Sequence, residues 1–356
     1  MESTVVSQWL DQIKISHRVD ELRTIRDQAS EVLQHSDSFN DEPFRNEQVN
    51  ALHDALIRRT LVLAEVEMSS RGLGNPPVAY AFLLFGSGGR EEQSLWSDQD
   101  NGIVYEDTHP QQAQAVDLYF RELSVIVVQR LEQLGYPPCD GEVSCNHSMW
   151  RMSLTQWQER LNQWLDEPNW ENMRYTLIVA DLRPVYGDET LGYSIKRSLH
   201  KRCETEPHLL KHLLENTLHR KIALGLFGQL ITERYGEAAG GVDIKYGSYI
   251  PMVNAIRLLA IQHKIEHAST IMRMKLLLQD GVIAEDLFED WYDAFLINLK
   301  LRFLVPVVLD NGKYVSHGKL TAELLTAPVK RELKFSLHAG ERLQKYVKHR
   351  IEKESR

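Results

Sequence analysis

The sequence predicts an α+β protein in which a small mixed sheet lies between an N-terminal and a C-terminal helical region. Apolar residues recur at helical spacing from Val5 to about Ser70, and again from Leu154 onward. Between these regions, the apolar run VAYAFLLF at residues 78–85 has turn residues on both sides, as a buried strand does. A second short strand, NGIVY, is predicted at residues 101–105. This pattern indicates an α+β fold.

We expect three domains along the chain. They are an N-terminal helical region at residues 1–74, a sheet-containing core at 75–150 and a C-terminal helical domain at 151–356. The first is predicted to be a helical pair or small bundle, interrupted by the polar segment HSDSFNDEP and ended by the linker RGLGNPP. The core should also hold a helix at 111–134 and a weaker third strand at 140–145. The C-terminal domain is expected to be helical, with blocks at residues 154–165, 177–185, 208–235, 252–279, 284–305 and 329–352.

Composition limits the class of protein. The chain has 356 residues, and a formal net charge of −9 argues against broad affinity for nucleic acid or anionic membranes. The apolar runs are shorter than the roughly 20 residues of a membrane span. Cys139, Cys145 and Cys203 are an odd number without a CxxC pair, so neither a disulfide framework nor a zinc ribbon is indicated. We expect a cytoplasmic protein with no nucleic-acid or membrane partner, whose exposed apolar helix stripes are compatible with a homodimer.

The segment FGSGGREEQSLWSDQDNGIVY, residues 85–105, carries the chemistry. Its strand ends in a glycine turn, Gly86-Ser87-Gly88-Gly89, where backbone N–H groups at the start of a helix suit a phosphate. Asp98 and Asp100 follow, and an extended chain would point both carboxylates to the same face. Two neighbouring carboxylates favour a hard cation such as Mg²⁺. Either feature alone is commonly a solvated turn, but together they predict transfer of a nucleotidyl or phosphoryl group.

The order strand, Gly86-Ser87, helix, Asp98-x-Asp100 resembles the nucleotidyltransferase superfamily, which includes kanamycin nucleotidyltransferase, DNA polymerase beta and the PII-protein uridylyltransferase. More closely, GSGGREEQSLWSDQDNGIVYED resembles the nucleotidyltransferases of bacterial signal transduction, which often carry CBS and cyclic-nucleotide-binding domains. The likeness extends through ALIRRTLVLAEVEM, GYPPC, WRMSLTQW, DLRPVYGD and IKYGSYIPMVNAIRLLA. Residues 1–77 are too few for a pair of CBS domains and have a helical pattern, so we expect neither fused domain here.

The resemblance implies that the enzyme moves NMP from an NTP, with ATP among the candidates, to an unidentified acceptor that could be a protein. It assigns Asp98 and Asp100 to Mg²⁺, with Mn²⁺ as the alternative. The other residues that it assigns, or that their loop suggests, are Gly86, Ser87 and Gly88 for the triphosphate loop, Arg90 for phosphate or loop stabilisation, Glu92 and Gln93 for the motif's helix, and Lys245 for a phosphate contact. An exposed loop lysine is the alternative for Lys245.

A third carboxylate commonly completes such sites as a base or a second metal ligand. Asp140 and Glu142 are candidates because they would share one face of the weaker third strand, although the family pattern there is closer to CPGGV. Asp181 is the other candidate, and a buried acid paired with Arg183 is its alternative role. Without a third acid, the alternative function is a non-catalytic nucleotide-binding regulatory module that acts through protein partners.

Overall fold

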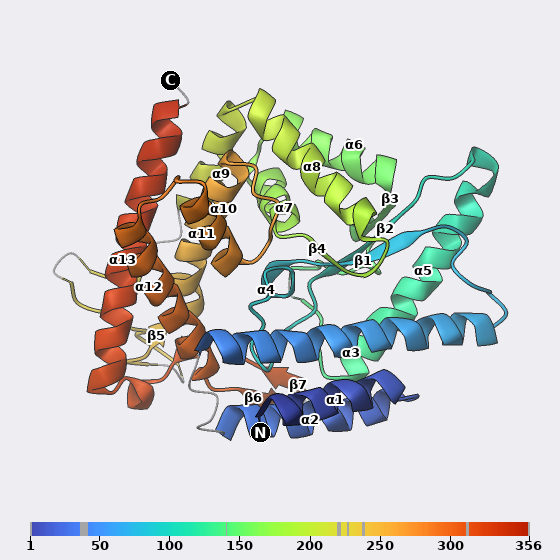
Figure 1. Cartoon of the computed structure of the whole chain (residues 1–356), viewed down its shortest axis with the longest axis horizontal. Helices are drawn as coiled ribbons and strands as arrows, with labels where there is room; N and C mark the ends of the chain where they lie inside the picture. Colours follow the sequence, from blue (N-terminus) through green and yellow to red (C-terminus); the bar gives the residue numbers. More distant parts are fainter. Residues whose placement is uncertain are drawn as a thin grey trace. The chain divides into compact units, whose positions relative to one another are not determined.

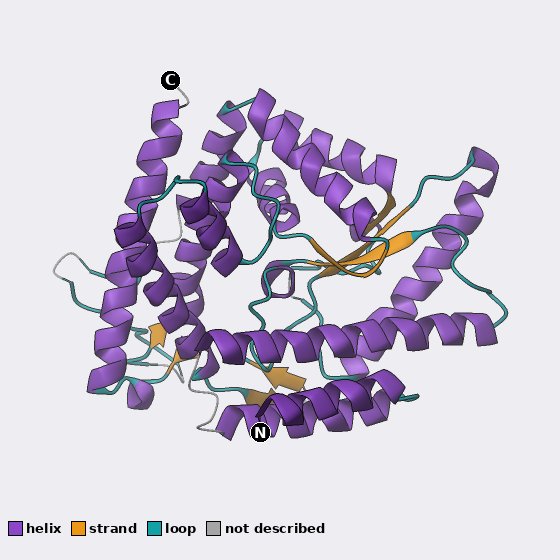
Figure 2. Cartoon of the chain, in the orientation of Figure 1, coloured by secondary structure: helices purple, strands orange, loops and turns teal. Residues whose placement is uncertain are grey.

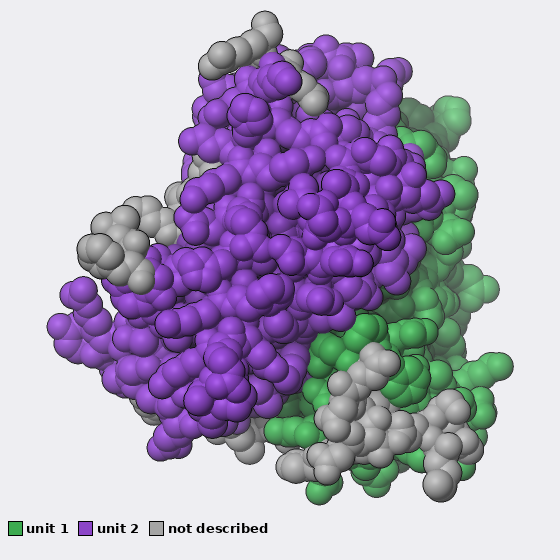
Figure 3. Space-filling view, turned by 60° about the vertical axis from the view of Figure 1, so that its left-hand side comes forward, with its two compact units in different colours: residues 1–163, 181–198 green, residues 164–180, 199–356 purple. Residues whose placement is uncertain are grey.

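The structure is a computed structural model, and it describes residues 2–35, 42–139, 141–218, 222–225, 228–236, 239–310 and 313–354. The chain forms two compact units, each from two stretches of sequence, coloured separately in Figure 3. Unit 1 comprises residues 1–163 and 181–198, and unit 2 comprises residues 164–180 and 199–356. The three expected domains were drawn from the order of elements along the sequence, whereas the two units are defined by packing. The boundaries of the three domains stay a prediction.

Unit 1 begins with helices and continues into the sheet. The helices are α1 (Glu2–Ile15), α2 (Val19–His35) and the long α3 (Glu42–Ser70). The sheet has the strand order β3-β2-β1-β4, where β1 is Tyr80–Leu84, β2 is Asn101–Tyr105, β3 is Arg151–Ser153 and β4 is Arg183–Gly187. Strand β1 runs antiparallel to β2 and β4, whereas β2 and β3 are parallel, so the predicted mixed sheet is confirmed (Figure 2).

The pairing of β1 with β2 fixes where the site lies. All five residues of each strand are buried, as expected for the two apolar runs. Leu84, the last residue of β1, lies opposite Asn101, the first residue of β2. The glycine turn that follows β1 and the acidic segment that precedes β2 therefore meet at one edge of the sheet.

Helices cover both faces of this sheet (Figure 1). On β4, Arg183 contacts Asp54 of α3, and the next residue, Pro184, lies against Gly192 of α8 (Glu189–Thr205). Because successive strand residues point to opposite faces, α3 and α8 lie on opposite sides. The remaining helices of this unit are α4 (Gly86–Gly89), α5 (Pro110–Gln133) and α6 (Leu154–Asp166), with the short 3₁₀ turn η2 (Ser148–Trp150).

Two secondary-structure predictions in this region are wrong. The described residues 141–145 form turns and irregular chain rather than a strand, and the third strand lies at residues 151–153 instead. Asn101 holds the segment by one backbone and one side-chain bond, since its N donates to Val143 O at 3.1 Å and its Oδ1 accepts from Cys145 N at 2.9 Å. Residues 183–185, the end of the block 177–185 that was predicted to be helical, belong to β4. Pro184 cannot donate a backbone hydrogen bond inside a helix, which was the signal in the sequence for this break.

Unit 2 is a helical domain built around α10 (Ile250–Gln262), whose residues 251–261 are all buried. The other helices are α7 (Trp170–Ala180), α9 (His208–Leu218), α11 (Thr270–Gln279), α12 (Glu285–Phe303) and α13 (Ala327–Glu354), with the short turns η3 (Lys245–Tyr249) and η4 (Ala322–Leu324). Two small antiparallel pairs complete it, namely β5 (Val242–Asp243) with β8 (Lys319–Leu320) and β6 (Val308–Asp310) with β7 (Lys313–Val315). Within the described residues, no helix is long and apolar enough to cross a membrane.

Candidate functional site

The glycine turn after β1 forms one wall of the site. Phe85 N donates to Asp100 O at 3.0 Å, which fastens the turn to the acidic segment. The chain then makes the single helical turn α4, Gly86–Gly89. The N–H groups of Gly86, Ser87 and Gly88 lie in the first turn of this helix and have no acceptor within it. Such groups are suited to bind an anion.

Two of the glycines are required by close contacts. Gly86 has φ +51°, and a Cβ atom built on it would lie 2.3 Å from Asp100 Oδ2. The backbone of the turn therefore lies directly against this carboxylate. A Cβ atom on Gly89 would lie 2.0 Å from Asp181 O, so this glycine lets the turn pack on the chain that enters β4. Close contacts therefore constrain the glycine turn on both sides.

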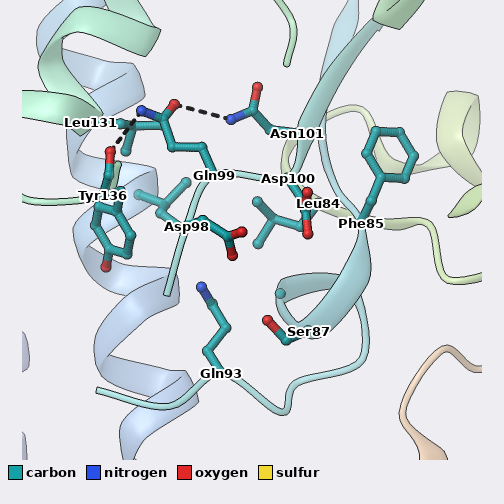
Figure 4. A pocket seen from close by; sticks show the side chains of 12 residues that line it. Leu84, Phe85, Ser87, Gln93, Asp98, Gln99, Asp100, Asn101, Leu131 and Tyr136 are labelled. Carbon is teal, nitrogen blue, oxygen red and sulfur yellow. Dashed lines mark hydrogen bonds between the residues drawn. The ribbon is translucent and has the colours of Figure 1, made fainter. Parts of the chain in front are cut away.

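Asp98 and Asp100 alternate with a buried glutamine. Gln99 Nε2 donates to Tyr136 O at 2.9 Å and to Val128 O at 3.3 Å, which holds the Gln99 side chain toward α5. The carboxylates of Asp98 and Asp100 are half-buried and face Ser87 and Gln93, whereas Gln99 points away toward Tyr136 (Figure 4). The two acids thus share one face of the chain, as their spacing indicated.

These residues line one pocket that is open to solvent. Its lining residues are Ile57, Leu84, Phe85, Ser87, Gly88, Gln93, Asp98, Gln99, Asp100, Asn101, Leu131 and Tyr136. None of them is basic, so the two carboxylates repel each other without a cation between them. Carboxylate oxygens beside a serine hydroxyl suit Mg²⁺ or Mn²⁺, which take their remaining ligands from water and phosphate. No cluster of three metal-ligating side chains occurs in the part of the chain that the structure describes.

Cys139 lies beside the acid pair, a neighbour that the sequence reasoning missed. Its thiol is hydrogen-bonded to Asp100, and its Sγ accepts from Gly141 N at 3.3 Å. Burial, reinforced by the charges of Asp100 and Asp98, raises the pKa of the Cys139 thiol to about 12. The residue therefore presents a neutral thiol to the carboxylates at physiological pH.

Arg90 lies in a buried ion-pair group beneath the turn. Its Nε donates to Glu92 Oε2 at 2.8 Å and its Nη1 to Asp181 Oδ2 at 2.6 Å. The side chains of Arg90 and Asp181 are only 4% and 1% exposed. Of the two roles expected for Arg90, its contacts are those of loop stabilisation, and Glu92 takes part in the same group. Asp181 is a buried acid, but its partner is Arg90 rather than Arg183.

Replacing Asp181 with alanine should lower the free energy of unfolding by about 3 kcal/mol, because it removes a partner from a buried arginine. Urea denaturation at pH 7 measures this change. Asp166→Ala is the control. The ion pair of Asp166 with Arg202 should contribute less than about 1 kcal/mol to stability, because the Asp166 carboxylate is largely exposed. Equal losses in the two variants would contradict a buried structural role for Asp181.

Gln93 points into the pocket from the other side. The backbone N of Gln93 donates to Asn50 Oδ1 at 2.9 Å, and Gln93 as a whole is 4% exposed. The side-chain Oε1 of Gln93 is buried and accepts no hydrogen bond from the described residues. A buried acceptor of this kind can be satisfied by a ligand hydroxyl or by water.

Of the remaining predicted residues, Glu142 is the one that the structure describes in the same unit as the pocket. Glu142 is exposed, has φ +56° and does not line the pocket, so it shares no strand face with a neighbour. Asp140 lies outside the described residues. Lys245 belongs to unit 2, where its Nζ lies 5.5 Å from the centre of the Tyr246 ring. Among the described candidates for a third carboxylate, neither Glu142 nor Asp181 lines the pocket.

His53 of α3 is a second neighbour that the sequence reasoning missed. Burial lowers the pKa of His53 to about 3, so the ring is neutral. Since Ser94 O can only accept, the Nε2–H of His53 donates to it at 3.0 Å, and Nδ1 accepts from the Tyr136 hydroxyl at 2.6 Å. His53 therefore connects the segment after the glycine turn to the pocket residue Tyr136.

A buried neutral histidine makes stability depend on pH. Because the pKa of His53 is about 3 in the folded protein and near 6.5 when unfolded, its contribution is complete above pH 6.5 and is lost as the pH falls. We expect the stability difference between wild type and His53→Gln to shrink by about 2 kcal/mol from pH 7.5 to pH 5. Urea denaturation at both pH values tests this, and an unchanged difference would mean that His53 is protonated in the folded state.

Two family models match the chain. The model described as Putative nucleotidyltransferase DUF294 matches residues 27–171, which include the glycine turn and the acid pair. The model described as Putative nucleotidyltransferase substrate binding domain, DUF294_C, matches residues 207–351 of unit 2. Together they cover most of the sequence. No curated protein matches the chain at a significant level.

Proposed function

Because the chain belongs to the DUF294 family of putative nucleotidyltransferases through both of the family's domains, we propose that it is a Mg²⁺-dependent enzyme that transfers NMP from an NTP to a protein acceptor in signal transduction. One observation carries the proposal. The carboxylates of Asp98 and Asp100 and the first-turn amides of α4 lie at the same edge of the sheet, with Gly86 in contact with Asp100. Cation ligands and phosphate donors are thus side by side.

Each part of the pocket has a role in this reaction. Asp98 and Asp100 would hold the metal ion, which would supply charge neutralisation and orientation of the triphosphate. The amides of Ser87 and Gly88 would bind phosphate oxygens, and the serine hydroxyl is placed to add a donor. An acceptor hydroxyl would form a bond to the α-phosphorus while the bond to the β-phosphate oxygen breaks and pyrophosphate leaves. The acceptor's proton would pass to a base or to water.

The lining of the pocket supplies only part of what the reaction needs. Its carboxylates, serine hydroxyl and backbone amides suit phosphates and a metal ion. The match to a putative substrate binding domain over residues 207–351 supports a role for unit 2 in binding the acceptor.

A thermal scan tests the proposal first. The protein is heated with ATP, UTP, CTP or GTP, each with and without Mg²⁺ or Mn²⁺. One nucleotide at 100 times its Kd should stabilise the protein by about 2.7 kcal/mol, and only with the metal present. That nucleotide, labelled at its α-phosphate, is then incubated with the enzyme and cell proteins, and covalent label is measured on a denaturing gel.

The two assays separate the candidate functions. Metal-dependent binding followed by covalent labelling supports the transferase. Binding without labelling or pyrophosphate release favours the regulatory module, a reading supported by the two described third-acid candidates, since neither lines the pocket. No stabilisation by any nucleotide would contradict both.

A further inference from the structure

One face of α3 holds the backbone of the segment that follows the glycine turn. Asn46 Nδ2 donates to Glu91 O at 2.8 Å, and Asn50 Oδ1 accepts from Gln93 N at 2.9 Å. One turn farther along, His53 donates to Ser94 O. Positions 46, 50 and 53 are spaced by four and three residues, so they share one side of the helix. All three α3 side chains are buried.

A fourth residue on this face acts through β4. Asp54 binds the guanidinium of Arg183 at both oxygens, each at 2.8 Å. Nη2 of Arg183 also donates to Gly88 O at 2.8 Å. The side chains of Asp54 and Arg183 are 11% and 12% exposed, and this burial strengthens their two-pronged ion pair. Arg183 therefore links α3 to the carbonyl of a pocket residue.

The segment needs this external support. Glu91 has φ +58°, a backbone region that residues with a Cβ atom adopt only at an energetic cost. The same residue lies between Gly88 and Gln93, both of which line the pocket. The contacts from α3 are made with backbone atoms at residues 91, 93 and 94, and Arg183 makes the contact at residue 88, so together they fix the path of the chain itself.

We propose that Asn46, Asn50, His53 and Asp54, the last acting through Arg183, are positioning residues that set the placement of Gly88 and Gln93 for the nucleotide. This inference rests on the proposed function of the pocket. It makes α3 a part of the nucleotide site. A displacement of α3 along its axis would shift its contacts with the segment together.

Arg183→Lys and Asn50→Ala test the proposal. The lysine keeps the charge but has a single nitrogen on a shorter side chain, so it cannot form the two-pronged pair with Asp54, and the alanine removes the acceptor for Gln93 N. Arg58→Ala is the matched control for the arginine, because Arg58 also approaches Asp54, at 3.3 Å, but bonds to Val185 O instead of the turn. Asn216→Ala is the control for the asparagine, since it also loses a side chain to backbone bond, the one that Asn216 Nδ2 donates to Trp170 O in unit 2.

Two readouts are compared at a temperature where circular dichroism shows every variant folded. The first is the Kd for the Mg²⁺ complex of the stabilising nucleotide, which should rise at least tenfold in both test variants and less than twofold in both controls. The second is amide exchange without nucleotide, which should be at least tenfold faster at residues 88–94 in the test variants alone.

The readouts distinguish this proposal from the proposed function. If the wild type binds no nucleotide, the proposed function fails, and faster exchange confined to the test variants would still show that α3 fixes the segment. The positioning role is overturned if the test variants exchange and bind like the wild type. It is also overturned if the controls change as much as the test variants, because the effect would then be general destabilisation.

Discussion

Replacing Asp98 and Asp100 together with asparagine is expected to reduce nucleotidyl transfer at least 1000-fold, which corresponds to about 4 kcal/mol of transition-state stabilisation. The reason is electrostatic, because the pocket would lose both anionic ligands for the metal. The fold should survive, since these half-buried carboxylates repel each other and no basic residue lines the pocket. Without nucleotide, the melting temperature should therefore be unchanged or higher.

Glu142→Gln is the control for this substitution. Glu142 is an exposed acid of the same unit that does not line the pocket, so its variant should retain transfer within twofold. Label transfer from the α-phosphate measures activity, and a thermal scan with Mg²⁺-nucleotide measures binding. Full activity in the double variant would show that Asp98 and Asp100 are not needed for the reaction. A large loss of activity in Glu142→Gln would show that Glu142 takes part in the site.

Replacing Gly86 with alanine is expected to lower stability by about 3 kcal/mol and transfer by at least 100-fold. Two costs combine. A residue with a Cβ atom is strained at φ +51°, and that Cβ atom would lie only 2.3 Å from Asp100 Oδ2. The overlap can be relieved only by moving the turn away from the carboxylate. That movement separates the phosphate donors from the cation ligand, so activity should fall further than stability alone explains.

Gly72→Ala separates the two costs. Gly72 also has a left-handed backbone, with φ +79°, but nothing lies within 4 Å of a Cβ atom built there. The Gly72→Ala variant should be about 1 kcal/mol less stable than the wild type and should keep its full activity. Urea denaturation and label transfer are measured on both proteins. If Gly86→Ala behaves like Gly72→Ala in both assays, the contact with Asp100 has no part in the reaction.

The sequence was most informative where one local pattern decides the structure. The apolar runs before Gly86 and after Asp100 predicted β1 and β2, because strands buried on both faces need continuous apolar sequence. The alternation of Asp98, Gln99 and Asp100 predicted a shared face for the acids, because side chains alternate along an extended chain. Both inferences depend only on residues that are neighbours in the chain.

Long-range partners could not be obtained in this way. The sequence suggested a phosphate or loop role for Arg90 and, as one alternative, a buried pair of Asp181 with Arg183. The observed partnership of Arg90 with Asp181 spans 91 residues and depends on how α4 packs against the chain entering β4. The polar residues Asn46, Asn50 and Asp54 have the helical spacing of a solvated face. They are buried because a loop some 40 residues later lies over them, as the bond from Asn46 to Glu91 shows.

The path of the chain between the units has a consequence for how this protein can be divided. The chain passes from one unit to the other after residues 163, 180 and 198, so unit 1 is not a continuous piece of sequence. A fragment cut at residue 150 would lose β3 and β4, and with them Asp181 and Arg183. The buried guanidinium of Arg90 and the carboxylate of Asp54 would then both lose a partner. A fragment that keeps these contacts must therefore continue through β4, although the chain enters unit 2 before it reaches that strand.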